Sequence, residues 1–278
     1  MEVMGGQALV EGVMMVSPRN VAMSVRKPSG KIKTVREERM ALHRQVQHLP
    51  FIRGIAALIE MMVLGTRGLM WSSNEIVDKK EQISSAAMVF MMSMSFLIGV
   101  AVFIALPLWI SHLLTQQRVL MNLIDGILRI LIFLAYLMLI SQIREVRRLF
   151  EYHGAEHMAV HCYEARKPLE PAQVRKFSTL HPRCGTAFVF IVLLISIILF
   201  SLIWSNHWLI KFAIRILLLP AIAGTSYELL RLSAKHQNKS LFRWFITPGL
   251  WFQKITTREP DKSQIEVAIA SLKRVLQP

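Results

Sequence analysis

The sequence is poor in cysteine and in acidic residues. Its 278 residues include two cysteines, Cys162 and Cys184, which are too few for the disulfide framework of a small secreted domain. Asp and Glu total 18 against 33 Lys and Arg, so the formal net charge is +15. Residues 1–11 also lack a basic region followed by an apolar run, and we therefore expect no cleaved signal peptide.

The basic excess does not predict binding to nucleic acid. The sequence has no basic helix with base-reading polar residues and no RNA-type aromatic motif. The Lys and Arg residues instead lie between apolar runs, where cations attract the anionic headgroups of lipids. We therefore expect anionic lipid headgroups as partners and no specific nucleic acid.

Four apolar runs each reach the ~20 residues that the core of a bilayer requires. They cover residues 86–110, 119–143, 185–205 and 209–232. The second contains Asp125 and Arg129, which we expect to form a structural pair because they are four residues apart on a helix. Lys and Arg are frequent in the segment 144–184 and in the C-terminal tail, so the positive-inside rule places both termini in the cytoplasm. The predicted fold is mainly α-helical and multi-pass.

Two further elements are expected before the first apolar run. Apolar and polar residues alternate over 21–26 and 31–36, around a turn that contains Pro28 and Gly30, which predicts a small β-hairpin. The glycine-punctuated segment 5–12 is expected to form a structured loop.

The segment 50–73 is apolar but carries three charges, Arg53, Glu60 and Arg67, at seven-residue intervals. They share one face of a helix, which predicts an amphipathic helix lying on the membrane surface. The chain then divides into six parts: a glycine loop and hairpin region (1–49), the amphipathic helix (50–73), two spans (86–143), a cytoplasmic His-rich loop (144–184), two more spans (185–232) and a basic cytoplasmic tail (233–278).

A histidine cluster follows the second span. His153 and His157 are one helical turn apart, and Glu156 lies about 60° from His153 around the helix axis. This is the H-x-x-E-H arrangement of inverzincins, in which both histidines bind zinc and the glutamate activates the attacking water. We expect His153 and His157 to be metal ligands and Glu156 to be the catalytic base.

Three later residues are further candidate ligands. His181 and Cys184 lie three residues apart where the chain enters the third span, and both side chains are good ligands for zinc or another divalent metal. Glu228 is an ionisable group in the fourth span near its cytoplasmic end, and such groups often mark functional sites.

Two arrangements of these ligands remain open. A closed tetrahedral site would be structural, and its four ligands would be His153, His157, His181 and Cys184. A site made of His153, His157 and Glu228 would leave a position open for water and would be hydrolytic. A straight helix would carry His153 ~15 Å beyond the membrane, so the second requires either a break in the helix, for instance at Gly154, or span boundaries that differ by several residues from those above.

The sequence resembles the YqhQ-type family of bacterial membrane proteins over nearly its whole length. The motifs that carry the resemblance are residues 5–15, 50–54, 152–157, 181–186, 226–228 and 256–261. The family is commonly labelled a predicted metal-dependent enzyme of unknown function. The resemblance implies location in the bacterial inner membrane, and it implies that the glycine loop, Glu11 and Glu60 belong to the functional part.

Two functions fit this sequence. The first is a metal-dependent hydrolase that acts at the cytoplasmic membrane face on a lipid-linked or membrane-protein substrate. The alternative is a non-enzymatic assembly factor or scaffold that binds membrane proteins and contains a structural metal site. A transporter is less favoured, because the spans contain few charges and no inverted repeat.

Overall fold

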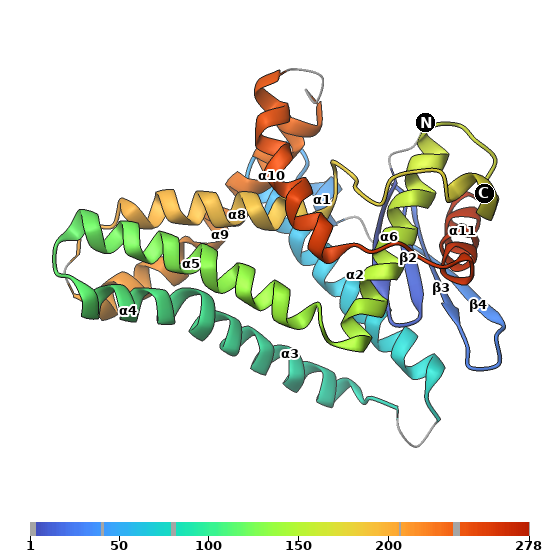
Figure 1. Ribbon diagram of the computed structural model, residues 1–278, viewed down its shortest axis with the longest axis horizontal. Coiled ribbons are helices and arrows are strands. Elements are labelled where there is room, and N and C mark those ends of the chain that lie inside the picture. Colours follow the sequence, from blue (N-terminus) through green and yellow to red (C-terminus); the bar gives the residue numbers. More distant parts are fainter. Residues whose placement is uncertain (1–3, 40–41, 79–81, 206, 236–239, 278) are drawn as a thin grey trace.

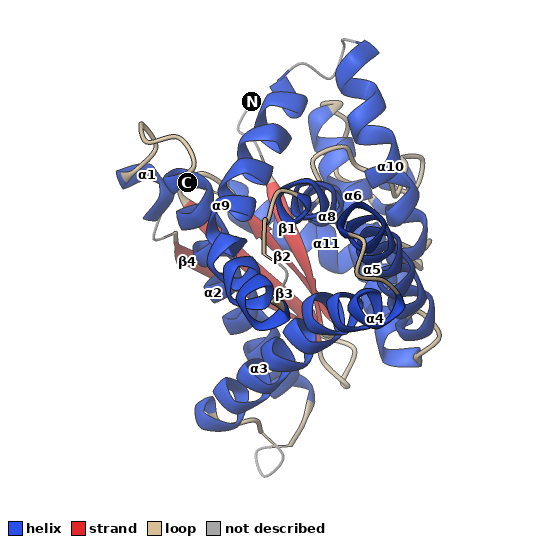
Figure 2. Ribbon diagram, turned by 90° about the vertical axis from the view of Figure 1, so that its left-hand side faces the viewer, coloured by secondary structure: helices blue, strands red, loops and turns tan. Residues whose placement is uncertain are grey.

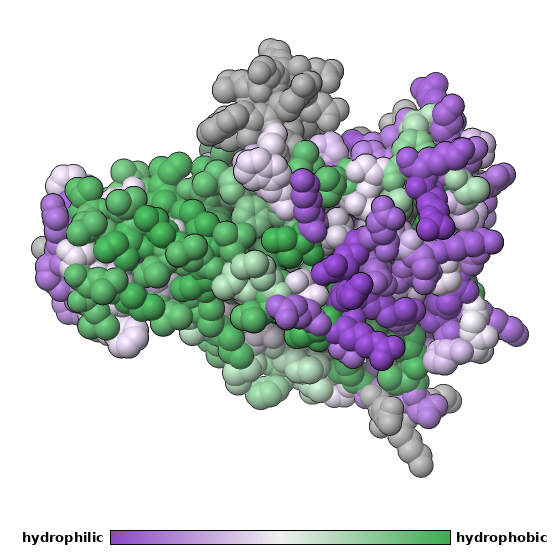
Figure 3. Space-filling view, in the orientation of Figure 1, coloured by the Kyte–Doolittle hydropathy of each residue, from purple (hydrophilic) through white to green (hydrophobic). Residues whose placement is uncertain are grey.

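The computed structural model describes residues 4–39, 42–78, 82–205, 207–235 and 240–277, and it has two unlike halves (Figure 1). Long helices form one half, and a small sheet with helices α6 (Arg144–Glu164) and α11 (Lys262–Leu276) forms the other. Apolar side chains cover the helical half and polar side chains cover the half with the sheet (Figure 3). This division matches that of a protein embedded in a membrane at one end only.

Four antiparallel strands form the sheet in the order β1-β2-β3-β4. Their bounds are Gly5–Leu9, Gly12–Val16, Asn20–Arg26 and Ile32–Glu38. The β3–β4 hairpin is the one predicted from the alternation of residues. The glycine-punctuated segment is not a loop but the β1–β2 hairpin, which turns at Glu11 with a φ of 52°. Every residue of β2 is buried, so this strand lacks the alternation that would have revealed it.

Helices cover both faces of the sheet (Figure 2), which explains why its central strands are buried. Helix α2 (Ile52–Ile76) packs on one face through a cluster that includes Leu9, Met14, Met23, Met61 and Trp71. Helices α6 and α11 pack on the other through a cluster that includes Val13, Met15, Tyr152, Ala155, Ile265 and Leu272. The α11 helix begins with a capping box between Asp261 and Gln264.

Helix α2 is longer than the amphipathic helix expected at 50–73, and two of the three expected charges, Arg53 and Glu60, are paired. Its 25 residues are apolar enough to cross a membrane. Arg53 binds the Glu228 carboxylate, with 2.7 Å between Nε and Oε1, and Glu60 accepts a hydrogen bond from Arg39. Pairing lowers the cost of placing these charges beside apolar surroundings.

Four helices in the described part of the chain are long and apolar enough to cross a membrane, and three of them confirm the runs expected at 86–110, 119–143 and 209–232. The four are α2, a continuous helix over Ser85–Leu114, α5 (Arg118–Ile140) and α9 (Trp208–Lys235), of which Trp208–Ser233 forms the candidate span. The continuous helix consists of α3 (Ser85–Val100), η1 (Ala101–Ala105) and α4 (Leu106–Leu114). The run expected at 185–205 forms α8 (Gly185–Ser201), an apolar helix of 17 residues, which is at the lower end of the roughly 17–25 residues found in membrane spans. The remaining helices are α1 (Leu42–Gln45), α7 (Pro171–Val174) and α10 (Ser240–Thr256).

A buried ion cluster joins α5, α8 and α9 inside the apolar half. Asp125 pairs with Arg129, as its spacing predicted, and also with Arg215 of α9, at 3.0 Å and 2.8 Å. All three side chains are almost completely buried, and Arg129 also donates to the hydroxyl of Ser196 on α8. A single carboxylate thus pairs with two guanidinium groups from two helices.

Replacement of Asp125 by Asn should therefore destabilise the helical half. It would leave two buried arginines without their carboxylate, and breaking a buried ion pair from one side costs about 3–5 kcal/mol. We expect a clearly lower thermal unfolding midpoint for the detergent-purified protein. The matched control is Asp78→Asn, because Asp78 is exposed in the loop after α2. Equal midpoints for the two variants would contradict the role of the ion cluster.

Candidate metal centre

The histidine-bearing helix is not a continuation of the preceding apolar helix. Helix α5 ends at Ile140, and α6 begins at Arg144 and runs in another direction (Figure 1). The break lies at residues 141–143 and not at Gly154, which is in the middle of α6. The sequence had predicted one continuous helix, because the helical pattern does not reveal a three-residue turn between two helices.

Gly154 instead allows the chain after α10 to lie directly against α6. A Cβ at this position would be 2.0 Å from the carbonyl oxygen of Arg258. The backbone N–H of Arg258 also donates to the Phe150 carbonyl, at 3.0 Å. This contact brings the end of α10 to the histidines of α6.

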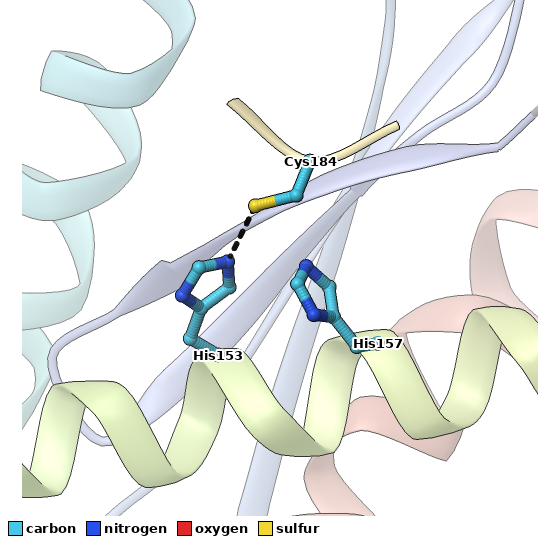
Figure 4. Close-up of side chains that lie close together, drawn as sticks. All are labelled: His153, His157 and Cys184. Atoms are coloured by element: carbon cyan, nitrogen blue, oxygen red, sulfur yellow. Dashed lines mark hydrogen bonds between the residues drawn. The ribbon is translucent and has the colours of Figure 1, made fainter. Parts of the chain in front are cut away.

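His153, His157 and Cys184 form the first group of candidate ligands. Both rings project from α6 toward Cys184, which precedes α8 (Figure 4). The distance between His153 Nε2 and Cys184 Sγ is 3.2 Å, and one ligand atom from each residue lies within 4.8 Å of the other two. Two ligands on a tetrahedral zinc ion are ~3.3–3.6 Å apart, given bonds of ~2.0 Å to nitrogen and ~2.3 Å to sulfur. The group therefore fits a metal ion.

Backbone carbonyl groups fix the orientation of both rings. His153 Nδ1 donates to Thr256 O at 2.8 Å, and His157 Nδ1 donates to Thr179 O at 2.5 Å. Each Nε2 then keeps its lone pair, which is how a metal-binding histidine is usually held. Burial, with the neighbouring histidines, holds the pKa of His157 well below its usual range, so its ring is neutral at pH 7.

Cys184 precedes the first turn of α8 and accepts a hydrogen bond from the Thr186 backbone N–H, at 3.4 Å. Burial raises the pKa of its thiol, although the Thr186 hydrogen bonds act in the opposite direction. The thiol is therefore protonated in the metal-free protein, and it would lose its proton on binding a metal ion.

His181 does not join this group, although its ring lies nearby. Its ligand atom groups with those of His161 and Glu164, again all within 4.8 Å. The ring centroids of His181 and His157 are 5.6 Å apart. The structure therefore divides the expected set of four ligands, and it leaves three of them around the first position.

Glu228 lies in neither group among the described residues. Its carboxylate accepts hydrogen bonds from Arg53 and from the Phe51 backbone N–H, on the α2 side of α9. This pairing explains an ionisable group here without a metal ion. The sequence could not reveal Arg53 as the partner because the two residues are 175 positions apart.

Glu156 is buried next to the first group, with 6% of its surface exposed. Its carboxylate makes no hydrogen bond to the described residues, and an added Cβ on Gly6 would lie 2.7 Å from its Oε1. Burial raises the pKa of Glu156 to about 8. A strand glycine thus lets a carboxyl group with a raised pKa sit beside candidate metal ligands, as active-site acids and bases often do.

A cavity of about 540 Å³ opens onto these side chains. His153, Glu156, His157 and Cys184 line it on one side. Its other walls are mainly apolar and include Ala57, Leu58 and Met61 of α2, Phe188 of α8 and Leu230 of α9. The cavity thus extends from the ligand group toward the helices of the apolar half.

Several contributors to the site were missed by sequence reasoning or known only through the resemblance. Gly6 and Gln7 of β1, in the glycine segment that the resemblance singled out, line the cavity. Glu11 is at a distance from the ligands in its own pair with Arg148, and it also accepts a hydrogen bond from Tyr152. No sequence pattern indicates which backbone carbonyl groups, here Thr179 O and Thr256 O, accept hydrogen bonds from the histidine rings.

Comparison with known proteins gives a family but no activity. A family model described as a protein of unknown function (DUF1385) matches residues 49–278. The chain belongs to this family. Over 294 residues it is 32% identical to the uncharacterized protein YqhQ of Bacillus subtilis (strain 168), covering 98% of this chain and 92% of that protein. No solved structure matches it.

A Gly154→Ala substitution should disturb the metal centre of this DUF1385 protein by displacing the backbone that packs against α6. The added methyl group would push the Arg258 backbone away, and overpacking typically costs about 1–3 kcal/mol. We expect a lower thermal midpoint and a weaker affinity for zinc, because Thr256 would move from His153. Gly99→Ala is the control, since no atom lies within 4 Å of its added Cβ. If both variants behave alike, the close contact at Gly154 has no structural role.

The free energy of unfolding of the metal-free protein should decrease as pH rises, because of Glu156. Its pKa is about 8 in the folded chain against an ordinary 4.5, so the folded state binds more protons between these values. Its stabilising contribution is complete below about pH 4.5 and is lost as pH rises through about 8. The expected loss between roughly pH 6 and pH 8 is about 2 kcal/mol.

Thermal midpoints measured in the presence of a chelator would show this slope. Glu156→Gln should flatten it, whereas Glu170→Gln should leave it unchanged because Glu170 is exposed. An unchanged slope in Glu156→Gln would mean that another group titrates.

Proposed function

We propose that the protein is a metal-dependent hydrolase of the membrane, with its site at the cytoplasmic face. The observation that carries the proposal is the buried carboxylate of Glu156, which has no hydrogen-bond partner among the described residues and lies beside three candidate metal ligands and a cavity. A structural zinc site normally has four protein ligands, whereas a catalytic one has three and an open position. His153, His157 and Cys184 form a group of three.

The chain's own residues have distinct roles in this proposal. His153 and His157 hold the metal ion through Nε2, and Cys184 holds it as a thiolate. A divalent cation bound there would supply Lewis-acid polarisation of the scissile group and a water of lowered pKa. Glu156 takes a proton from the attacking water as the water oxygen bonds to the scissile carbonyl or phosphoryl centre. It then gives that proton to the leaving group as the scissile bond breaks.

The raised pKa of Glu156 suits this exchange of protons. A general base works best when its pKa is near the operating pH, and an ordinary carboxylate is too acidic for that. Burial moves the pKa of Glu156 to about 8, and the charge of a bound cation would move it downward again. The two effects together place the group where it can both accept and return a proton near neutrality.

The substrate in this proposal is an amphiphile. The apolar cavity walls from α2, α8 and α9 suit an acyl chain or an apolar peptide segment, and the polar group to be cleaved would lie at the histidines. Arg183 also lines the cavity and could receive an anionic headgroup.

The membrane orientation in this proposal follows the distribution of basic residues. Both termini and the segment 144–184 lie in the cytoplasm of a bacterial cell, and their Lys and Arg residues contact anionic lipid headgroups. In this orientation α3–α4, α5, α8 and α9 cross the inner membrane, and α2 lies beside the sheet at the cytoplasmic face.

Hydrolysis of fluorogenic long-chain acyl esters and phosphate esters in mixed micelles tests the proposal. We expect Glu156→Gln to keep its zinc and to lose about 10²–10⁴-fold in rate, since it retains the ligands but not the base. His157→Ala should lose activity together with the zinc ion held by His153, His157 and Cys184. Glu170→Gln, in the exposed turn before α7, is the control and should match the wild type.

The alternative function would give a different pattern in cells. If Glu156→Gln fully replaced the wild type in a deletion strain while His157→Ala did not, the metal site would be structural. The protein would then be a scaffold or assembly factor.

A further inference from the structure

A second cluster of ligands lies one helical turn beyond the first. His161 and Glu164 belong to the last turns of α6, and His181 faces them from the segment before α8. One ligand atom from each lies within 4.8 Å of the other two, as in the first group. Two histidines and one glutamate are also the protein ligands of many zinc sites.

The two clusters are adjacent but distinct. Along α6 the ring centroids of His153 and His157 are 4.4 Å apart, and His181 lies 5.6 Å from His157 and 4.5 Å from His161. The cavity is lined by the first group and by His181, but His161 and Glu164 do not line it. The second cluster therefore borders the cavity through His181 alone, and its other two ligands lie outside the cavity lining.

The geometry of the second cluster fits a metal ion. His181 Nε2 and Glu164 Oε2 are 3.4 Å apart, close to the ~3.3 Å between two ligands that are each ~2.0 Å from a tetrahedral zinc ion. His161 Nε2 donates to Leu180 O at 2.9 Å, which leaves its Nδ1 lone pair for a metal ion. Arg183 binds the other oxygen of Glu164, so Oε2 remains available and the carboxylate is held in place.

One contact would have to change on binding. The Arg183 backbone N–H lies 3.3 Å from His181 Nδ1, which in the metal-free chain accepts this long hydrogen bond. A metal ion on Nε2 moves the ring proton to Nδ1, so the peptide at Arg183 would turn away. Because Arg183 directly precedes Cys184, a turn of this peptide would also change the position of Cys184 in the first group.

We propose that His161, Glu164 and His181 bind a second divalent metal ion, which fastens the segment 175–184 to α6 and so positions Cys184 at the first. The backbone of His181 is already held by Gln253 of α10, whose amide group donates to His181 O and accepts from His181 N, both at 2.8 Å. Cys184 follows His181 by three residues. The second ion completes this anchoring and makes the site dinuclear.

Cobalt titration of detergent-purified, metal-free protein tests the proposal. The protein should carry a purification tag without histidine, so that the tag adds no ligands. A cobalt ion bound by a thiolate shows an intense sulfur-to-metal charge-transfer band, whereas one bound only by nitrogen and oxygen shows weak d–d bands. The wild type should therefore bind two equivalents with different spectra, and inductively coupled plasma mass spectrometry should count two.

Variants assign each equivalent to a cluster. His161→Ala and Glu164→Gln should each bind one equivalent that keeps the charge-transfer band. Cys184→Ala should bind one equivalent without that band. His112→Ala, on α4 and outside both clusters, should bind two. Thermal unfolding of every variant would show that lost binding is not lost folding, and Glu164→Gln supplies a variant of unchanged size.

The outcomes separate this proposal from the hydrolase proposal. One equivalent in the wild type that is unaffected by His161→Ala would overturn the second site and leave the first. One equivalent lost in His161→Ala but retained in Cys184→Ala would support the second site and overturn the first. Loss of all metal in both variants would show one shared centre, and no binding by folded wild type would overturn both sites.

Discussion

The backbone of α6 and the chain that follows α10 lie so close at Gly154 that an added Cβ would be 2.0 Å from the Arg258 carbonyl oxygen. The rest of the centre depends on this approach. It places Thr256 O against His153, and the same region of α10 carries Gln253, which holds the backbone of His181. Side chains from three distant parts of the chain can then share one small volume without flexible loops.

The other face of α6 explains why its position is well determined. Tyr152, Ala155 and Ala159 pack with β2 and α11 in the largest apolar cluster, so the helix cannot rotate without exposing core residues. Rotation by one residue would turn His153 and His157 away from Cys184. The apolar packing on one side therefore fixes the polar geometry on the other, and this is the arrangement that a preorganised site requires.

The site also lies where the two halves of the molecule meet. The sheet supplies Gly6 behind Glu156, and the long helices supply the apolar walls of the cavity. A carboxyl group there loses contact with water, which raises its pKa, while the cavity still connects it to apolar surroundings.

The sequence by itself determined the family, the helical class, the β3–β4 hairpin and the short-range pairs, because a turn of helix or a hairpin brings such residues together locally. His153 with His157, and Asp125 with Arg129, are of this kind. Only the tertiary structure decided that Glu228 pairs with Arg53, that His181 joins His161 and Glu164, and that β1 and β2 are strands. These depend on contacts between residues far apart in the chain or on burial of both faces of a strand, and neither leaves a periodic pattern in the sequence.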